Sequence, residues 1–165
     1  MIILGIDPGS VITGYAIIKT ENARKNSPEV IDFGCIITDS FATTGERLKK
    51  INKDITGLIK KHRPNIMSIE TLFFFKNLKT VMPVSQTKGV ILLAAAEKKL
   101  PVMEFTPLQI KMAIAGYGRA EKKQVQEMIK RVVCLDGFDL KENNRKKDDA
   151  YDALGVALCA SIKAY

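Results

Sequence analysis

Three aspartates near the end of the chain have the residue type and spacing for metal-dependent chemistry. Asp148, Asp149 and Asp152 lie in a run, residues 147–158, that otherwise favours burial. In a helix that advances about 100° per residue, Asp149 lies at the edge of the apolar face and Asp152 about 60° further round, whereas Asp148 points away. Carboxylates near a protein interior require a partner, and a divalent cation is one candidate. The alternative is a solvated first turn whose acids complement the helix N-terminus.

Two further carboxylates end short apolar runs elsewhere in the chain. Residues 2–7 are typical of a buried strand ending at Asp7, and residues 66–70 of another ending at Glu70. If these strands are parallel neighbours, both acids emerge at the sheet edge where α/β proteins usually place their sites. The four acids together would repel one another unless protonated or metal-bound, and hard oxygen ligands select Mg²⁺ or Mn²⁺. Two such ions can activate a water and stabilise a leaving oxygen in phosphoryl chemistry.

The elements that must position these acids follow from the spacing of apolar residues. Strands are predicted at residues 2–7, 13–19, 30–38, 66–70 and 102–105, and helices at 44–63, 78–99, 107–115, 120–133 and 148–163. Gly34 is expected to form a β-bulge, and Pro83 marks either a kink or the first helical position. Residues 136–147 are polar and expected to be mobile. The order predicts one α/β domain, residues 1–165, with a five-stranded mixed sheet flanked by helices.

The composition favours an anionic partner. The net charge is +8, from 26 Lys and Arg against 18 Asp and Glu, and nucleic acid is the commonest partner of such a chain. A phosphodiester substrate needs both a positive surface and metal-loaded carboxylates, although a merely basic globular protein would show the same charge. No apolar run of about 18 residues and no signal peptide is present, and the three cysteines are scattered, so a cytoplasmic protein is expected.

The residues around the acids resemble a known family. The matching segments are Ile6-Asp7-Pro8-Gly9, Ile69-Glu70 with Phe73 and Lys76-Asn77, Gln86 with Gly89, and Asp149-Ala150-x-Asp152-Ala153-Leu154. These segments resemble the RuvC family of bacterial Holliday junction resolvases, and the resemblance extends over nearly the whole chain. The resemblance implies a ribonuclease H-like fold and a homodimer that cuts two opposed strands of a four-way DNA junction during recombination and repair. It also implies an Mg²⁺-dependent endonuclease with the RuvA–RuvB branch-migration complex as a partner.

The resemblance assigns the catalytic acids to Asp7, Glu70, Asp149 and Asp152. Asp7 is expected to bridge two metal ions, Glu70 and Asp152 to add further ligands, and Asp149 to act as a ligand or to position the attacking water. The single histidine, His62, precedes a helix-terminating proline and is expected to be on the surface or structural. Because no Ser–His or Cys–His pair is therefore expected beside the acids, metal-supported water attack fits the residues that the chain offers.

The resemblance also indicates the DNA contacts. Phe73 matches the family position whose ring stacks on a junction base, whereas Phe74 and Phe75 also suit core packing. Phosphate contacts are expected from a polar and basic set comprising Lys76, Asn77, Lys111, Arg119, Lys122 and Lys123, although any one lysine can instead be a solvated charge. The family dimerises through the helix that includes residues 84–98, and the alternative is that this helix only covers the sheet.

Three other functions compete with junction cleavage. A non-catalytic junction-binding module would share the basic surface but has no need of four intact acids. Another ribonuclease H-like nuclease, either RNA-cutting or YqgF-type, would share Asp7, whereas the Glu70-Phe73-Lys76-Asn77 cluster favours the resolvase. The turn at residues 5–10 is also similar to the first phosphate turn of actin-like and Hsp70-like ATPases, but those proteins need a second lobe that 165 residues do not supply.

Overall fold

The computed structural model describes residues 1–21, 27–71, 78–135 and 144–163. In this part of the chain the elements are β1 Ile2–Asp7, β2 Ile12–Lys19, β3 Glu29–Ile37, α1 Thr44–His62, β4 Ile66–Glu70, α2 Leu78–Glu97, β5 Val102–Phe105, α3 Pro107–Ala115, α4 Lys122–Val132 and α5 Asn144–Lys163. None of the described helices combines the length and apolar character that a membrane span requires. The predicted alternation of strands and helices is thus confirmed.

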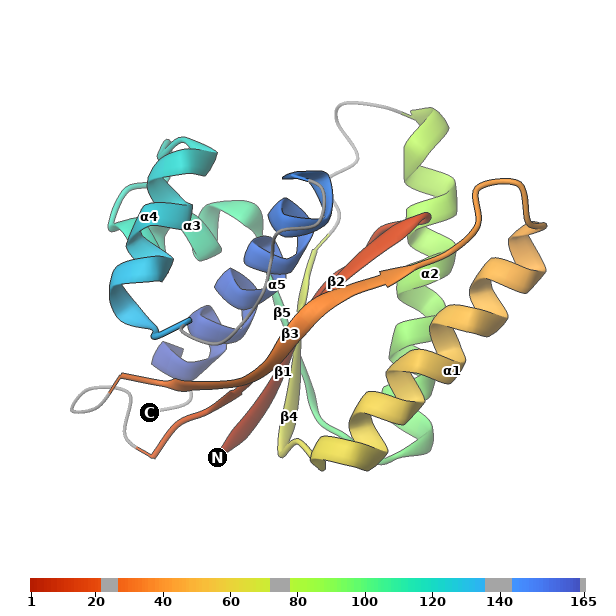
Figure 1. The fold of residues 1–165 in the computed structure, drawn as a ribbon, viewed down its shortest axis with the longest axis horizontal. Helices are drawn as coiled ribbons and strands as arrows, with labels where there is room; N and C mark the ends of the chain where they lie inside the picture. The colour runs from red at the N-terminus through yellow and green to blue at the C-terminus, as the bar shows by residue number, and fades with distance from the viewer. Residues whose placement is uncertain (22–26, 72–77, 136–143, 164–165) are drawn as a thin grey trace.

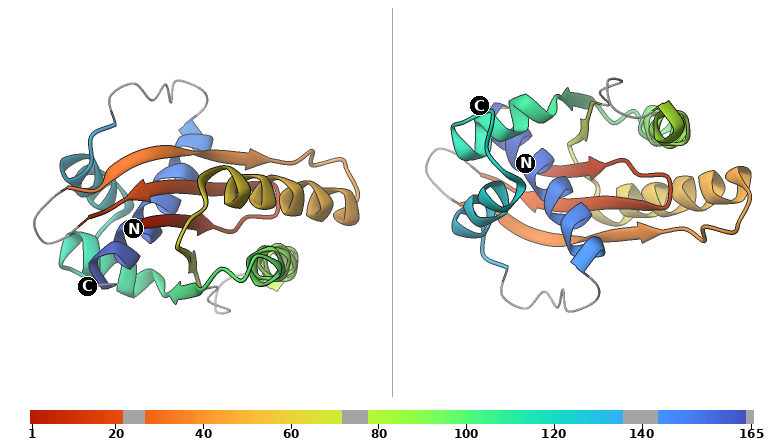
Figure 2. Two further views of the ribbon diagram at one scale, coloured as in Figure 1. Left: turned by 90° about the horizontal axis from the view of Figure 1, so that it is seen from below. Right: turned by 90° about the horizontal axis from the view of Figure 1, so that it is seen from above.

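The strands form one mixed sheet in the order β3-β2-β1-β4-β5. β1, β2 and β3 are antiparallel neighbours joined as a meander, whereas β4 pairs parallel with β1 on one side and with β5 on the other. Helices α1 and α2 cover one face, and α5 lies across the other with α3 and α4 beyond it (Figures 1 and 2). The sheet is therefore buried between two helical layers, as its apolar strands require.

Helix α1 illustrates how the sequence sets one of these layers. The Thr43 hydroxyl accepts from the Glu46 backbone N–H, and the Glu46 carboxylate accepts from the Thr43 N–H, which closes a capping box at the start of the helix. The buried residues Ile51, Ile55 and Ile59 recur at four-residue steps and pack with α2 and the sheet. Pro64 follows the left-handed cap residue Arg63, so the helix ends where β4 must begin.

Helix α5 forms the opposite layer and reaches the sheet closely because two strand residues are glycine. A Cβ on Gly14 would overlap the carbonyl oxygen of Asp149, and a Cβ on Gly5 would lie 2.7 Å from the Cβ of Ala157. Alanines on the helix match these glycines on the strands, and the residues between Ala150 and Ser161 are nearly all buried. The close approach brings the start of α5 against the ends of β1 and β2.

One local expectation was wrong, and one of two alternatives is excluded. Gly34 pairs in register with Tyr15, and the irregularity lies at Ile31, because Ile17 pairs with Asp32 and Ile18 with Val30. Gly34 instead makes room for a ring, since a Cβ there would lie 3.2 Å from the Tyr15 hydroxyl. Pro83 is not the first residue of the helix, because it lies inside α2. The helix continues through it without the hydrogen bond that a backbone N–H at this position would donate.

The last two helices also differ from expectation at their N-termini. Helix α4 begins at Lys122 rather than at residue 120, because Glu121 is its N-cap residue and pairs with Gln124 in a capping arrangement. Helix α5 begins at Asn144, four residues earlier than predicted, so residues 144–147 are helical rather than part of a mobile segment. Polarity alone misled the prediction there, because a solvated first turn of a helix is as polar as a loop.

Candidate active site

The two strand-borne acids reach the same edge of the sheet. β1 and β4 pair in parallel with Ile6 opposite Ile69, so Asp7 and Glu70 each occupy the next position at the carboxyl end of their strands. The carboxyl groups of Asp7 and Glu70 are joined by a hydrogen bond. The parallel pairing that the sequence could only assume is thus present, and it places two acids where α/β folds commonly hold their sites.

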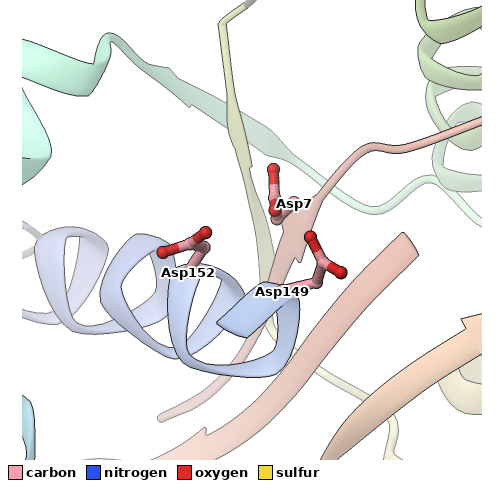
Figure 3. A group of neighbouring side chains, drawn as sticks. All are labelled: Asp7, Asp149 and Asp152. Atoms are coloured by element: carbon pink, nitrogen blue, oxygen red, sulfur yellow. The ribbon is translucent and has the colours of Figure 1, made fainter. Parts of the chain in front are cut away.

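Helix α5 brings two aspartates to Asp7. One carboxylate oxygen from each of Asp7, Asp149 and Asp152 lies within 4.8 Å of the others, and all three side chains are partly buried (Figure 3). Glu70 borders this group through Asp7 but is not one of the three. Three of the four predicted acids therefore form one compact oxygen cluster, with the fourth in contact with it, and an all-oxygen donor set of this size fits a hard divalent cation.

The electrostatics of the cluster favour a bound cation. Burial raises the pKa of Asp7 well above its ordinary value, and the negative charges of the other three acids raise it further. Burial and the charge of Asp152 raise the pKa of Glu70 to about 7, against the opposing effects of the hydrogen bond to Asp7 and of two lysines. Burial also raises the pKa of Asp152. Repulsion and desolvation of this kind are relieved when positive charge enters the cluster.

Lys122 supplies part of that positive charge. Its ammonium group donates a hydrogen bond to Asp152 over 2.8 Å and lies 3.6 Å from Asp148, whose other oxygen accepts from Gln126. Burial lowers the pKa of Lys122, but the aspartates outweigh this effect and its pKa is raised overall. Asp148, which was expected to point away from the core, is thus held beside the site by α4.

A pocket of about 260 Å³ opens beside the acids. Glu70, Asp152, Lys111 and Lys122 provide its charged wall, and its apolar wall comes from Pro107, Ile110, Val125, Tyr151 and Gly155. Two acids and two lysines in one concavity are suited to hold a phosphodiester beside a metal site, since lysines can contact phosphate oxygens and carboxylates can face a cation.

Of the residues predicted to contact DNA, two line this pocket. They are Lys111 on α3 and Lys122 on α4. Arg119, just before α4, and Lys123, on α4, are exposed but are not among the lining residues. Phe73, Lys76 and Asn77, like Phe74 and Phe75, lie outside the described residues.

The glycines that set the position of the aspartates were not predicted from the sequence. Gly14 allows the backbone of Asp149 to lie against β2, and Gly155 leaves room for the side chains of Ile114 and Ile129. Glycine inside a strand or a helix weakens that element. Its presence at Gly14 and Gly155 could therefore have indicated from the sequence that another segment of the chain packs closely there.

The fold and the acid cluster define a class of protein. A five-stranded sheet of this order, with acids at the end of β1 and on the C-terminal helix, is the ribonuclease H-like arrangement. A family model described as crossover junction endodeoxyribonuclease RuvC matches residues 3–160. The chain therefore belongs to the RuvC family.

Relatives and solved structures agree with this assignment. The crossover junction endodeoxyribonucleases RuvC of Halothermothrix orenii and Alkaliphilus metalliredigens are 46% and 50% identical to the chain, over 96% of its length and 91% and 92% of theirs. The fold is similar to that of Thermus thermophilus RuvC in complex with a Holliday junction substrate, with a TM-score of 0.87 and 27% identity over 99% of this chain and 94% of the other.

Proposed function

We propose that this protein is a structure-specific endonuclease that resolves Holliday junctions by hydrolysing phosphodiesters in two opposed strands. The observation that carries the proposal is that carboxylate oxygens of Asp7, Asp149 and Asp152 lie within 4.8 Å of one another. Glu70 is hydrogen-bonded to Asp7, and the adjacent pocket is lined by two lysines. The family to which the chain belongs supports the same substrate. Four ionisable acids at one edge suit a nuclease better than a module that only binds junctions.

We propose that the acid cluster binds Mg²⁺, with two ions in each site, and that Mn²⁺ substitutes for it. Asp7, Asp149 and Asp152 would hold the metal, and Glu70 would complete the ligand set through its position next to Asp7. When bound, the metal supplies Lewis-acid stabilisation of the phosphodiester and a lowered pKa for the attacking water. Oxygen-only ligands favour these hard cations over softer ones.

The remaining polar residues of the pocket act on the substrate directly. Lys111 lines the pocket and faces Glu70, so it is suited to hold a non-bridging phosphate oxygen. Lys122 neutralises Asp152 in this structure. If a cation neutralised the acid cluster, the ammonium group of Lys122 would be available to contact the phosphate. Without a metal ion, the pKa of Glu70 is about 7, so this carboxyl group binds a proton in part at neutral pH and would lose it when a cation binds.

We also propose that two copies act together through α2. Met82 and Leu93 are 66% and 54% exposed on this helix, and a Cβ at Gly89 would meet open space. Large apolar side chains exposed around a small residue allow a second helix to pack closely. A two-fold dimer would direct two identical sites at the two opposed strands of a symmetric junction. We also propose the RuvA–RuvB branch-migration complex as a partner of this protein.

A cleavage assay on three substrates tests the proposal. The protein is incubated with a synthetic four-way junction, with a duplex of the same sequence and with an RNA–DNA hybrid, each with Mg²⁺ or with EDTA. We expect paired nicks in the junction only, and only with Mg²⁺. Asp7→Asn should abolish the nicks while junction binding is retained. Junction binding without cleavage would favour the binding module, and cutting of the hybrid would favour an RNA-cutting nuclease.

A further inference from the structure

A second concave surface lies at the end of the sheet opposite to the acid cluster. It encloses about 520 Å³ between the C-terminal ends of α1 and α2, and residues 59–60, 63–65 and 98–101 line it. We call this surface the basic hollow. β4 begins at Ile66, directly after the last lining residue of α1, and ends at Glu70 (Figure 1). A strand of five residues, about 13 Å in length, therefore separates the hollow from the acids.

The rim of the basic hollow carries only positive charge. Its exposed residues include Lys60, Arg63, Lys98 and Lys99, and no acidic residue is among the described residues that line it. None of these four cations has an ion pair within the part of the chain that the structure describes. The C-termini of α1 and α2 contribute about half a negative charge each. The rim thus has more positive charge than the ends of two helices neutralise.

Two of these cations lie where glycine is the favoured residue. Among the described residues, Arg63 (φ 47°) and Lys99 (φ 53°) are the only non-glycine residues with a left-handed backbone, and both line the hollow. The backbone N–H of Lys99 donates to the Ala96 carbonyl oxygen over 2.9 Å, in a type of helix end that glycine usually completes. Arg63 also precedes a proline, which favours an extended backbone. Glycine would meet these backbone requirements more easily, but it would bring no charge to the hollow.

The floor of the basic hollow is apolar. Ile59, Pro64 and Leu100 line it and are buried, and Pro101 is exposed beside them. Phosphate groups have no apolar atoms to place on such a floor. A peptide can place an apolar side chain there, with carboxylates on either side that pair with the cations of the rim. The combination of floor and rim therefore fits an acidic peptide better than a DNA backbone.

We propose that the basic hollow binds an acidic segment of a partner protein. An apolar side chain of the segment would cover Leu100 and Pro101, and carboxylates before and after it would pair with Arg63 and Lys99. Because the hollow and the acids lie at opposite ends of β4, the segment can bind while a four-way junction occupies the acid cluster. The proposal does not depend on the cleavage proposed above. The hollow of a second copy of this chain carries the same charge, so two hollows would repel each other.

A peptide probe tests this proposal with the full chain. The probe is a capped peptide with one leucine between two groups of three glutamates, and its counterpart has serine in place of the leucine. We expect saturable binding of the leucine peptide, at least fivefold weaker binding of the serine peptide, and amide chemical-shift changes centred on residues 59–65 and 98–102. A saturating four-way junction, with Ca²⁺ in place of Mg²⁺, should alter the affinity for the peptide by less than twofold.

Glycine substitutions separate binding from a structural role. Arg63→Gly and Lys99→Gly should each keep or raise the melting temperature, because glycine favours the left-handed backbone. Each should weaken peptide binding at least threefold, because one cation of the rim is lost. Lys98→Gln should weaken binding to a similar extent, whereas Lys49→Gln, exposed on α1 and outside the hollow, should leave it unaltered.

Three results would overturn the proposal. Equal binding of the leucine and serine peptides, or equal binding by Arg63→Gly and Lys49→Gln, would show only a general attraction between opposite charges. Displacement of the peptide by the junction, or shifts of the same amides with duplex DNA alone, would assign the hollow to nucleic acid. Shifts of these amides that depend on protein concentration without peptide would assign it to a second copy of the chain.

Discussion

At the scale of single residues, the site depends on carboxyl groups that the fold makes costly to ionise. Asp7 and Glu70 have raised pKa values because both are buried and each faces other acids. Lys122 compensates only in part, since it contacts Asp152 and Asp148 from one side. The protein thus retains an arrangement that is unfavourable without a cation, as expected where function rather than stability selects the residues.

The first prediction concerns the pH dependence of stability without metal. In the folded protein Glu70 keeps its proton up to about pH 7, whereas its ordinary pKa is 4.5, so between these values the folded state binds more protons. Stability should therefore fall as pH rises through this window, by at most about 3 kcal/mol. Chemical unfolding in EDTA from pH 4.5 to 7.5 measures the fall.

Glu70→Gln is the control for this pH dependence. The glutamine carries no ionisable group, so the decline should be shallower and due mainly to Asp7. Added Mg²⁺ should offset the decline at neutral pH in the unaltered protein, because a ligand that binds only the folded state stabilises it. A wild-type decline no steeper than that of Glu70→Gln would contradict the assigned pKa.

The second prediction concerns Lys111 as a phosphate contact. Junction binding should weaken when salt increases, and each phosphate contact contributes about 0.9 to the logarithmic slope. Lys111→Gln should lower that slope by about this amount, measured by fluorescence anisotropy in several salt concentrations with Ca²⁺ in place of Mg²⁺. Lys60→Gln, on α1 and outside the pocket, should leave the slope unaltered. If both variants showed the same salt dependence of junction binding, Lys111 would not be a phosphate contact.

At the scale of elements, the site exists because a helix approaches two strands closely. Gly5 and Gly14 lack the Cβ atoms that would collide with α5, and the residues facing them are the backbone of Asp149 and the segment from Ala153 to Ala157. This contact sets the distance between Asp7 and the two helical aspartates. The position of α5 on the sheet therefore sets the geometry of the acid cluster as well as that of the core.

The third prediction is that Gly14→Ala damages the site through this contact. The added methyl group would overlap the carbonyl oxygen of Asp149, so the start of α5 must move away from β2. We expect a loss of about 1–3 kcal/mol of stability from overpacking and a fall in junction cleavage of at least tenfold. Urea unfolding and a Mg²⁺ titration of cleavage measure the two effects.

Gly45→Ala is the matched control, because a Cβ there would meet open space in the first turn of α1. It should leave both the stability and the Mg²⁺ dependence nearly unaltered. If Gly14→Ala were destabilised but cleaved with an unchanged Mg²⁺ requirement, the glycine would serve the core without positioning Asp149.

The elements were largely predictable from sequence, whereas the contacts between them were not. Asp7 and Glu70 were identified because each ends an apolar strand, and Asp149 and Asp152 because their spacing places them beside an apolar helical face. Two contacts join residues about 30 positions apart. They are the hydrogen bond from Lys122 to Asp152 and the contact between His62 and Asp32 over 3.0 Å. Such contacts depend on how helices pack, which local periodicity does not specify; His62 was expected only to be on the surface or structural.

At the scale of the whole molecule, α5 links the site to the folding of the complete chain. Its residues from Ala150 to Ser161 are nearly all buried and pack on β1, β2 and the helices α3 and α4. Asp149 and Asp152 therefore reach Asp7 only after the last element of the chain has docked. On the opposite face, α2 is packed on one side by α1 and the sheet, and its other side carries the exposed residues Met82 and Leu93.

The fourth prediction follows from this exposed side of α2. If two copies pair there, Leu93→Glu buries two carboxylates in an apolar contact and should shift the protein to monomers in analytical ultracentrifugation, with little change in its melting temperature. Ile162→Glu, at a similarly exposed position near the end of α5, should leave the oligomeric state unaltered.

Cleavage provides the second measurement. A dimer nicks both opposed strands of one junction within its lifetime, so its products are paired, whereas a monomer should release junctions nicked once. A Leu93→Glu protein that stayed dimeric, or that still produced paired nicks as a monomer, would show that α2 only covers the sheet.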